Sequence, residues 1–263
     1  MLKPVLRLTS RRSLFVCLAA GFASSPGPTF AADEIAYAEF NSEYVRLDLN
    51  TGSTDNIEPL SDNIVVGAFA GSDSSREYSA DAFDSFISIA TSDATTSLLG
   101  QLAITGSPGG MAWDPVIKTM ILTAADASCA NGTFYTLDVA TGATQQVGSE
   151  QGCIKGLAID SDENAFSIDI TADKLVRFDL GPIGDLGFNV TGVEGLFFDW
   201  TGALDLIATD QSTGLAGLYI VDAQTGVATL VDADTSGYSA FALSPDPDAI
   251  FRNAFEADSG GFR

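Results

Sequence analysis

Carboxylates are the side chains of this sequence that are best placed to do chemistry. The 263 residues include 35 Asp and Glu, 12 Lys and Arg, and no His. Without an imidazole, Ser-His-Asp and Cys-His nucleophilic catalysis and histidine-bound zinc or copper are excluded. Carboxylates alone could hold a hard cation such as calcium, or act as general acids and bases.

One short segment has the spacing of a cation site. Asp160, Asp162 and Asn164 alternate as at the start of a calcium-binding loop, but the glycine at the sixth position and the distal Glu are missing. Asp and Asn are also the usual residues of a hairpin turn. We therefore interpret the segment as a turn and expect no cofactor, with calcium as the single candidate.

The elements that must position these acids repeat along the chain. Apolar segments ending at residues 48, 90, 138, 179 and 222 recur at intervals of 42, 48, 41 and 43 residues. Three of them end in Asp and continue to a Thr-Gly pair, as in Asp138 with Thr141 and Gly142. This period is that of a four-stranded propeller blade. The recurrent Asp is expected to hold the following hairpin turn rather than to catalyse.

A second repeated phrase predicts the innermost strand of each blade. Runs such as 110–114, 156–160 and 195–199 are nearly all apolar and begin with glycine, so that neighbouring strands can crowd around an axis. Residues 238–244 resemble such a strand with no blade after it, while 35–40, 44–49 and 53–58 resemble three strands with no inner strand before them. Joining them closes the ring. We predict an all-β propeller of five four-stranded antiparallel blades, one of them composite.

In this architecture, the loops between blades and those between second and third strands emerge at one end. The acids expected there could ring the central channel as a binding face: Asp62, Asp84, Asp126, Asp173, Glu194 and Asp210. Cys129 and Cys153 fall in two such loops of neighbouring repeats, so we predict a disulfide between them. Trp113 is expected in the core between blades, and Trp200 in an exposed turn.

The repeats resemble those of secreted bacterial β-propellers related to the YVTN and NHL-like families, whose units read G-x-A-x-D and then L-Y-x-x-D-x-x-T-G. Residues 156–160 and 218–226 carry these two phrases, and the resemblance covers most of residues 35–244. It implies a propeller scaffold and no particular activity, because its motifs are structural. A WD40 protein is disfavoured, since no Trp-Asp pair ends a third strand and histidine is lacking.

Residues 1–31 have the parts of an export signal: a basic stretch through Arg12, an apolar run from Leu14, and small residues before a cleavage expected between Ala31 and Ala32. The Arg11-Arg12 pair also resembles the twin-arginine motif, so two export routes stay open. We expect a periplasmic or extracellular protein with a propeller over 32–247 and a tail over 248–263.

The charge of the mature chain restricts its partners. Removing the 4 basic residues of the signal from the 12 leaves 8 against 35 acids, a net charge of -27. Such a surface repels phosphate backbones and anionic lipids, so we expect no nucleic-acid partner. No later apolar run approaches the roughly 18 residues of a membrane span. We expect a soluble monomer.

The function favoured by the sequence is that of a non-enzymatic exported module, which presents the acidic end to an unknown protein, glycan or small ligand. The alternative is a histidine-free enzyme that uses carboxylates, with calcium as an optional aid, on carbohydrate or lactone-like substrates. A third hypothesis is a purely structural role in the cell envelope. A tight cation site or a converging pair of carboxylates at the channel mouth would favour the enzyme.

Overall fold

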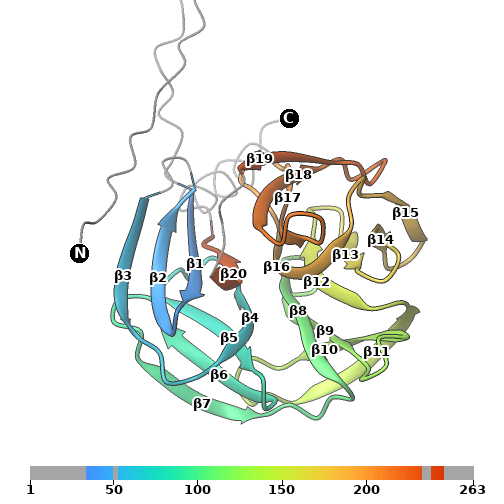
Figure 1. The fold of residues 1–263 in the computed structure, drawn as a ribbon. Helices are drawn as coiled ribbons and strands as arrows, with labels where there is room; N and C mark the ends of the chain where they lie inside the picture. The colour runs from blue at the N-terminus through green and yellow to red at the C-terminus, as the bar shows by residue number, and fades with distance from the viewer. Residues whose placement is uncertain (1–33, 50–52, 233–237, 246–263) are drawn as a thin grey trace, which may run out of the picture. The chain divides into compact units, whose positions relative to one another are not determined.

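The computed structural model describes residues 34–49, 53–232 and 238–245, which form five four-stranded antiparallel sheets (Figure 1). The predicted propeller of five blades is confirmed. The predicted signal, its cleavage site at Ala31 and Ala32, and the tail over 248–263 lie outside the described residues.

Each blade has four strands, which follow one another from the innermost to the outermost. Blade 1 contains β20 (Tyr238–Leu243), β1 (Ile35–Phe40), β2 (Glu43–Asp48) and β3 (Ser53–Pro59). Blade 2 contains β4 (Ile64–Phe69), β5 (Arg76–Asp81), β6 (Ser85–Ala90) and β7 (Thr96–Gln101). Blade 3 contains β8 (Ser107–Asp114), β9 (Thr119–Ala125), β10 (Asn131–Leu137) and β11 (Thr144–Gln151). Blade 4 contains β12 (Ile154–Ile159), β13 (Ala165–Asp169), β14 (Lys174–Arg177) and β15 (Gly181–Asp185). Blade 5 contains β16 (Val190–Phe198), β17 (Leu204–Asp210), β18 (Ala216–Val221) and β19 (Ala228–Asp232).

The composite blade closes the ring as predicted. Strand β20 pairs antiparallel with β1, so that Leu243 lies opposite Ala36, and β1 continues to β2 and β3. The second blade, whose sequence departs most from the repeat, still has four regular strands. Its third strand ends at Ala90 where other repeats have Asp, and Asp93 instead accepts the backbone N–H of Thr95 in the turn.

The glycines of the inner strands are required by close packing. A Cβ on Gly110 would lie 2.3 Å from the backbone carbonyl carbon of Gly156 in the next blade, and one on Gly195 would lie 2.7 Å from Cβ of Phe241. Both distances are shorter than atoms tolerate. The first small residue of each repeat therefore lets five strands converge, and the apolar core fills the spaces between adjacent blades.

The recurrent Asp at the end of the third strand holds its hairpin turn, as predicted. Oδ1 of Asp138 accepts the backbone N–H of Ala140 at 2.8 Å, and Oδ1 of Asp222 accepts that of Gln224 at 2.8 Å. A carboxylate that accepts backbone N–H groups in a turn is ordinary turn chemistry. These acids are structural.

A buried carboxyl joins blades 1 and 2. Glu77 is fully buried, Tyr44 donates a hydrogen bond to its Oε2 at 2.7 Å, and Ser79 donates one to its Oε1 at 2.9 Å. Burial raises the pKa of Glu77 from 4.5 to about 7. The folded protein therefore holds this proton more tightly than the unfolded chain does.

Glu77→Gln is expected to weaken the pH dependence of stability. Because the folded pKa is raised, the stabilisation is complete below about pH 4.5 and is lost as the pH rises to about 7, a change on the order of 3 kcal/mol. Glutamine keeps an acceptor for Tyr44 but does not titrate. Denaturant unfolding between pH 4.5 and 8 measures the slope of the unfolding free energy against pH. Glu58→Gln, at an exposed position, should keep the wild-type slope, and an unchanged slope in the Glu77 variant would contradict the assignment.

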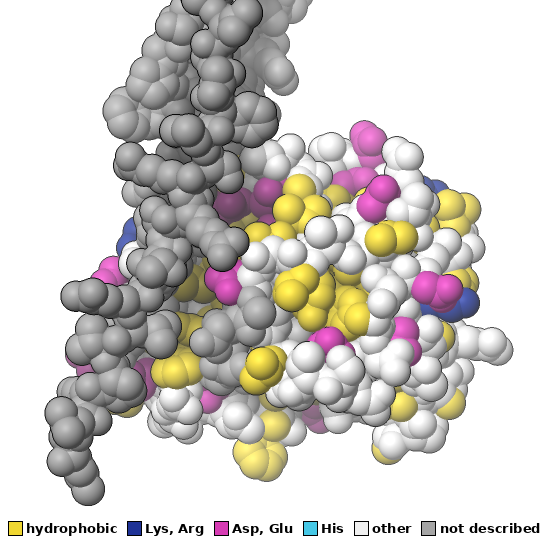
Figure 2. Space-filling view, turned by 45° about the horizontal axis from the view of Figure 1, so that its top comes forward, with side chains coloured by type: hydrophobic (Ala, Val, Ile, Leu, Met, Phe, Trp, Pro, Cys, Tyr) yellow, Lys and Arg dark blue, Asp and Glu magenta, His cyan; other side chains and the backbone are white. Residues whose placement is uncertain are grey.

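Acidic side chains are spread over the face drawn in Figure 2, where Lys and Arg are sparse and hydrophobic side chains gather near the middle. No helix among the described residues is long and apolar enough to cross a membrane.

Candidate active site at the channel mouth

The inner strands β20, β4, β8, β12 and β16 line three successive cavities along the propeller axis. The first has a volume of about 260 Å³ and the third about 460 Å³, and a waist of about 20 Å³ lies between them. Leu157 and Leu196 line both the first cavity and the waist, and Glu194 lines both the waist and the third cavity. The third cavity is the channel mouth at the end where the loops between blades emerge.

Every inner strand has a β-bulge at the level of the waist. The register shifts between Ile64 and Val66 in β4, Pro108 and Gly110 in β8, Lys155 and Ala158 in β12, and Val193 and Gly195 in β16, and it also shifts where β20 pairs with β1. A bulge changes which face a side chain points to. The bulges in β12 and β16 accompany Lys155 and Glu194, the two charged residues that line the third cavity.

More polar side chains line the third cavity than line the first cavity or the waist. Its polar lining side chains come from different blades and are Asn63, Ser107, Lys155, Thr191, Glu194 and Ser239. Among the described lining residues, Lys155 and Glu194 are the ones that carry a formal charge. They come from the adjacent inner strands β12 and β16, so one ammonium and one carboxyl share a single cavity.

Glu194 has the environment of a general base. Its side chain is half-buried, and Thr209 donates a hydrogen bond to its Oε1 at 3.1 Å. Burial raises the pKa of Glu194 above its ordinary value, and the Thr209 hydrogen bond opposes this in part. A carboxylate with a raised pKa accepts a proton more readily, which suits the activation of water.

Lys155 has the environment of an electrophile. Its Nζ donates a hydrogen bond to the carbonyl oxygen of Pro108 at 3.3 Å, and burial lowers its pKa. In the part of the chain that the structure describes, no carboxylate lies within ion-pair distance of this ammonium. An ammonium that is not engaged in a direct ion pair can stabilise negative charge on a substrate oxygen.

The other predicted face acids lie at the same end, four of them on loops and Asp210 at the end of β17, and most accept hydrogen bonds there. Asp126 accepts hydrogen bonds from Ser128, Ala130 and Asn131 within its own loop, which holds its pKa well below the usual range. The carboxylate of Asp210 accepts both the N–H and the O–H of Ser212. That of Asp173 accepts the N–H of Val190 at 2.7 Å, while Asp62 accepts the hydroxyl of Ser61 at 3.2 Å. Asp84 has a φ of 61° in the loop between β5 and β6. Of the six acids, Glu194 is the one that lines the cavity.

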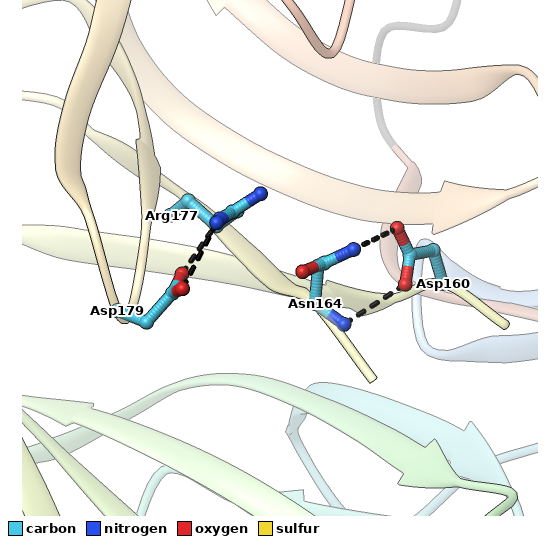
Figure 3. A network of polar contacts seen from close by, with 4 residues as sticks. All are labelled: Asp160, Asn164, Arg177 and Asp179. Atoms are coloured by element: carbon cyan, nitrogen blue, oxygen red, sulfur yellow. Dashed lines mark hydrogen bonds and ion pairs between the residues drawn. The ribbon is translucent and has the colours of Figure 1, made fainter. Parts of the chain in front are cut away.

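The segment that resembles a calcium loop is a turn (Figure 3). Oδ1 of Asp160 accepts the backbone N–H groups of Asp162 and Asn164, and its Oδ2 accepts the side-chain amide of Asn164 at 2.7 Å. The nearby Arg177 binds Asp179 through two hydrogen bonds of 2.6 and 2.9 Å. Both oxygens of Asp160 are therefore used by their own loop.

The donor set of the described residues does not fit calcium. Calcium takes six to eight oxygen ligands, usually with several carboxylates. No group of three or more Cys, Asp and Glu side chains in residues 34–49, 53–232 and 238–245 could hold a metal ion. The channel mouth offers the single carboxyl of Glu194, with the ammonium of Lys155 in the same cavity.

The predicted disulfide is present. Cys129, in the loop between β9 and β10, is bonded to Cys153, which directly precedes β12. Cys153 is buried, and its N–H donates to Asp169 at 3.2 Å. Lys155 follows two residues later, so the disulfide anchors the start of the strand that carries the candidate electrophile.

The two tryptophans line the first cavity, at the other end of the channel. Trp113 also packs against the core between blades, as predicted. Trp200 is half-buried, contrary to the expectation of an exposed turn, because its indole N–H donates to the carbonyl oxygen of Ser244 at 3.1 Å. Their shared cavity depends on closure of the ring, which brings residues 113 and 200 to one axis.

The chain is similar to several proteins of known structure. No protein-family model and no curated protein matches the sequence. A regucalcin from Agrobacterium tumefaciens, described as a calcium-binding protein, is similar over 81% of this chain and 75% of its own, with 16% identity and a TM-score of 0.54. A gluconolactonase from Xanthomonas campestris is similar over 79% of this chain and 80% of its own, with 15% identity and a TM-score of 0.53. A propeller in a nidogen/laminin complex covers 81% of this chain and 100% of its own, with 12% identity and a TM-score of 0.51.

These similarities establish the β-propeller fold, as the resemblance of the repeats implied. They also contradict the expectation of a non-enzymatic module, because gluconolactonase and regucalcin propellers are among the similar structures. The sequence pointed away from an enzyme because its repeated motifs are structural, whereas Lys155 and Glu194 belong to no repeated motif.

Proposed function

We propose that this protein hydrolyses lactones at the 460 Å³ channel mouth, with Glu194 as general base and Lys155 as the group that stabilises the oxyanion. One observation carries the proposal. A half-buried carboxyl and a half-buried ammonium line one open cavity, where burial raises the pKa of the first and lowers that of the second. Lactone hydrolysis needs a proton acceptor for water and a cation or donor for the carbonyl oxygen.

The waist of the channel suits the attacking water. Its volume of about 20 Å³ is enough for about one water molecule, and Glu194 lines both the waist and the mouth. A lactone bound at the mouth would present its carbonyl carbon to this water and its carbonyl oxygen to Lys155. Glu194 takes a proton as the water oxygen bonds to the carbon. The ring C–O bond then breaks, and Glu194 returns the proton to the leaving alkoxide.

The remaining polar groups support binding of a small, hydroxylated ring. Asn63, Ser107, Thr191 and Ser239 offer an amide and three hydroxyls around the cavity, and its volume lies in the usual range for small-molecule sites. Hydroxyl groups on the substrate could exchange hydrogen bonds with them. No step of this mechanism is routed through calcium, since the donor set of the described residues does not fit it.

We also propose that the protein acts outside the cytoplasm. Disulfides persist mainly in oxidising compartments, and the Cys129–Cys153 bond supports such a location. The predicted export signal agrees with it.

The test is a proton-release assay of the purified protein on a panel of γ- and δ-lactones, including glucono-δ-lactone, with and without a chelator. Turnover above the buffer blank that survives the chelator is expected. Lys155→Met, which keeps the apolar stem but removes the charge, should lower kcat/KM by about 10²-fold or more, as loss of an oxyanion donor does. No turnover on any lactone, or full activity in the Lys155 variant, would contradict the proposal.

A further inference from the structure

The cavity at the channel mouth is electrically balanced. Lys155 and Glu194 are the charged side chains among its described lining residues, and their charges cancel when both are ionised. A substrate inside the cavity therefore meets one positive and one negative group, with no excess of either sign.

The loops that frame this cavity are acidic. Asp62 directly precedes the lining residue Asn63, and Asp84 follows the lining residue Ala82 by two positions. The carboxylate of Asp173 accepts the N–H of Val190, a residue that directly precedes the lining Thr191. These three carboxylates therefore stand on or against the backbone segments that form the entrance.

Two more carboxylates lie at the same end, Asp126 on a loop and Asp210 at the end of β17. Asp126 and Asp210 accept hydrogen bonds from their own loops, which fixes both carboxylates there. Lys174, at the start of β14, could offset this charge, but it lies 3.5 Å from Asp185. The whole chain carries a net charge of -23, so the long-range field has the same sign as the entrance.

We propose, on the basis of the proposed lactone hydrolysis, that this site selects uncharged lactones and rejects those that carry a phosphate or carboxylate group. A neutral lactone crosses the acidic entrance without electrostatic cost, whereas an anionic one is repelled on approach. Lys155 does not reverse this selection, because Glu194 balances it inside the cavity.

The same field favours release of product. Hydrolysis forms a C–O bond from water and breaks the ring C–O bond. The product is a hydroxy acid, whose carboxyl group is ionised at neutral pH. The neutral substrate thus becomes an anion inside an acidic entrance. Its carboxylate is repelled outward, and inhibition by the hydroxy acid should be weak.

The test compares two matched substrates, glucono-δ-lactone and its 6-phosphate ester, with the full chain. At 10 mM ionic strength the Debye length is about 30 Å, and kcat/KM for the phosphate ester should be at least about tenfold lower. At 1 M salt, where the Debye length is about 3 Å, the ratio of kcat/KM for the phosphate ester to kcat/KM for the neutral lactone should approach one.

A pair of variants isolates the entrance. Asp62→Asn with Asp84→Asn removes two entrance charges, and asparagine tolerates the positive φ at residue 84. Asp162→Asn with Glu163→Gln removes two charges from the exposed hairpin between β12 and β13, at the other end of the propeller. The first pair should raise the ratio of phosphate-ester to neutral-lactone kcat/KM several-fold at low salt, and the second pair should leave it unchanged.

The outcomes separate the two proposals. Equal or faster hydrolysis of the phosphate ester at low salt would overturn the selection for neutral lactones and leave lactone hydrolysis standing. If both variant pairs change the ratio of phosphate-ester to neutral-lactone kcat/KM equally, the discrimination arises from the net charge of the protein. That result would overturn the role of the entrance. Failure to hydrolyse either substrate, together with the rest of the lactone panel, would overturn lactone hydrolysis and this inference with it.

Discussion

Glu194→Gln is expected to lower kcat/KM for a lactone substrate by at least about a hundredfold. General-base catalysis contributes about 10²- to 10⁴-fold, and glutamine cannot accept the proton of the attacking water. Its side-chain oxygen can still accept the hydrogen bond that Thr209 donates to Oε1 at 3.1 Å. The loss should therefore appear in catalysis while the fold is kept.

The pH profile of the same variant gives an independent reading. Because burial raises the pKa of Glu194, wild-type kcat/KM should rise with pH as this carboxyl loses its proton above the ordinary range of Glu. Because burial lowers the pKa of Lys155, the rate should fall again as the ammonium deprotonates below the ordinary range of Lys. In Glu194→Gln the acidic limb should disappear and the alkaline limb should stay.

The matched control is Glu58→Gln, which removes a carboxylate from the exposed outer strand β3. It should retain wild-type kcat/KM and an intact melting transition. Wild-type activity in Glu194→Gln, or loss of the alkaline limb alone, would contradict the role of Glu194 as the base.

Loss of the disulfide is expected to cost about 3 kcal/mol of unfolding free energy. The bond joins cysteines 24 residues apart, and closing a loop of this length restricts the unfolded chain by about that amount. For a domain of this size, the melting temperature should fall by roughly 10 °C. Cys129→Ser with Cys153→Ala tests this, since alanine leaves no hydroxyl at the buried position 153.

Reduction provides the control for this experiment. Dithiothreitol should lower the melting temperature of the wild type to that of the double variant and should not affect the variant. Lactone activity should fall with the disulfide, because Lys155 lies two residues after Cys153. An unchanged melting temperature in a sample whose thiol titration confirms reduction would contradict the stabilising role.

Periodicity alone was enough to predict the architecture. The intervals between the third strands, the glycine that opens each inner strand and the Asp of each hairpin are local signals that recur along the chain, so errors in one copy are corrected by the others. The irregular second blade shows this, since Ala90 replaces the usual Asp and the blade still forms. The disulfide followed from the same reasoning, because strand direction decides at which end each loop emerges.

The candidate active site was decided by tertiary structure. Strand alternation puts every second side chain on one face, but a bulge shifts that alternation by one residue, and whether a bulge forms depends on the register with the neighbouring strand. The sequence placed Glu194 among six acids of equal standing, and it contained no signal that singles out Lys155. The bulges in β12 and β16 bring these two residues, 39 positions apart, to one cavity. Burial there, which no short segment of sequence encodes, sets their pKa values and hence the chemistry they can do.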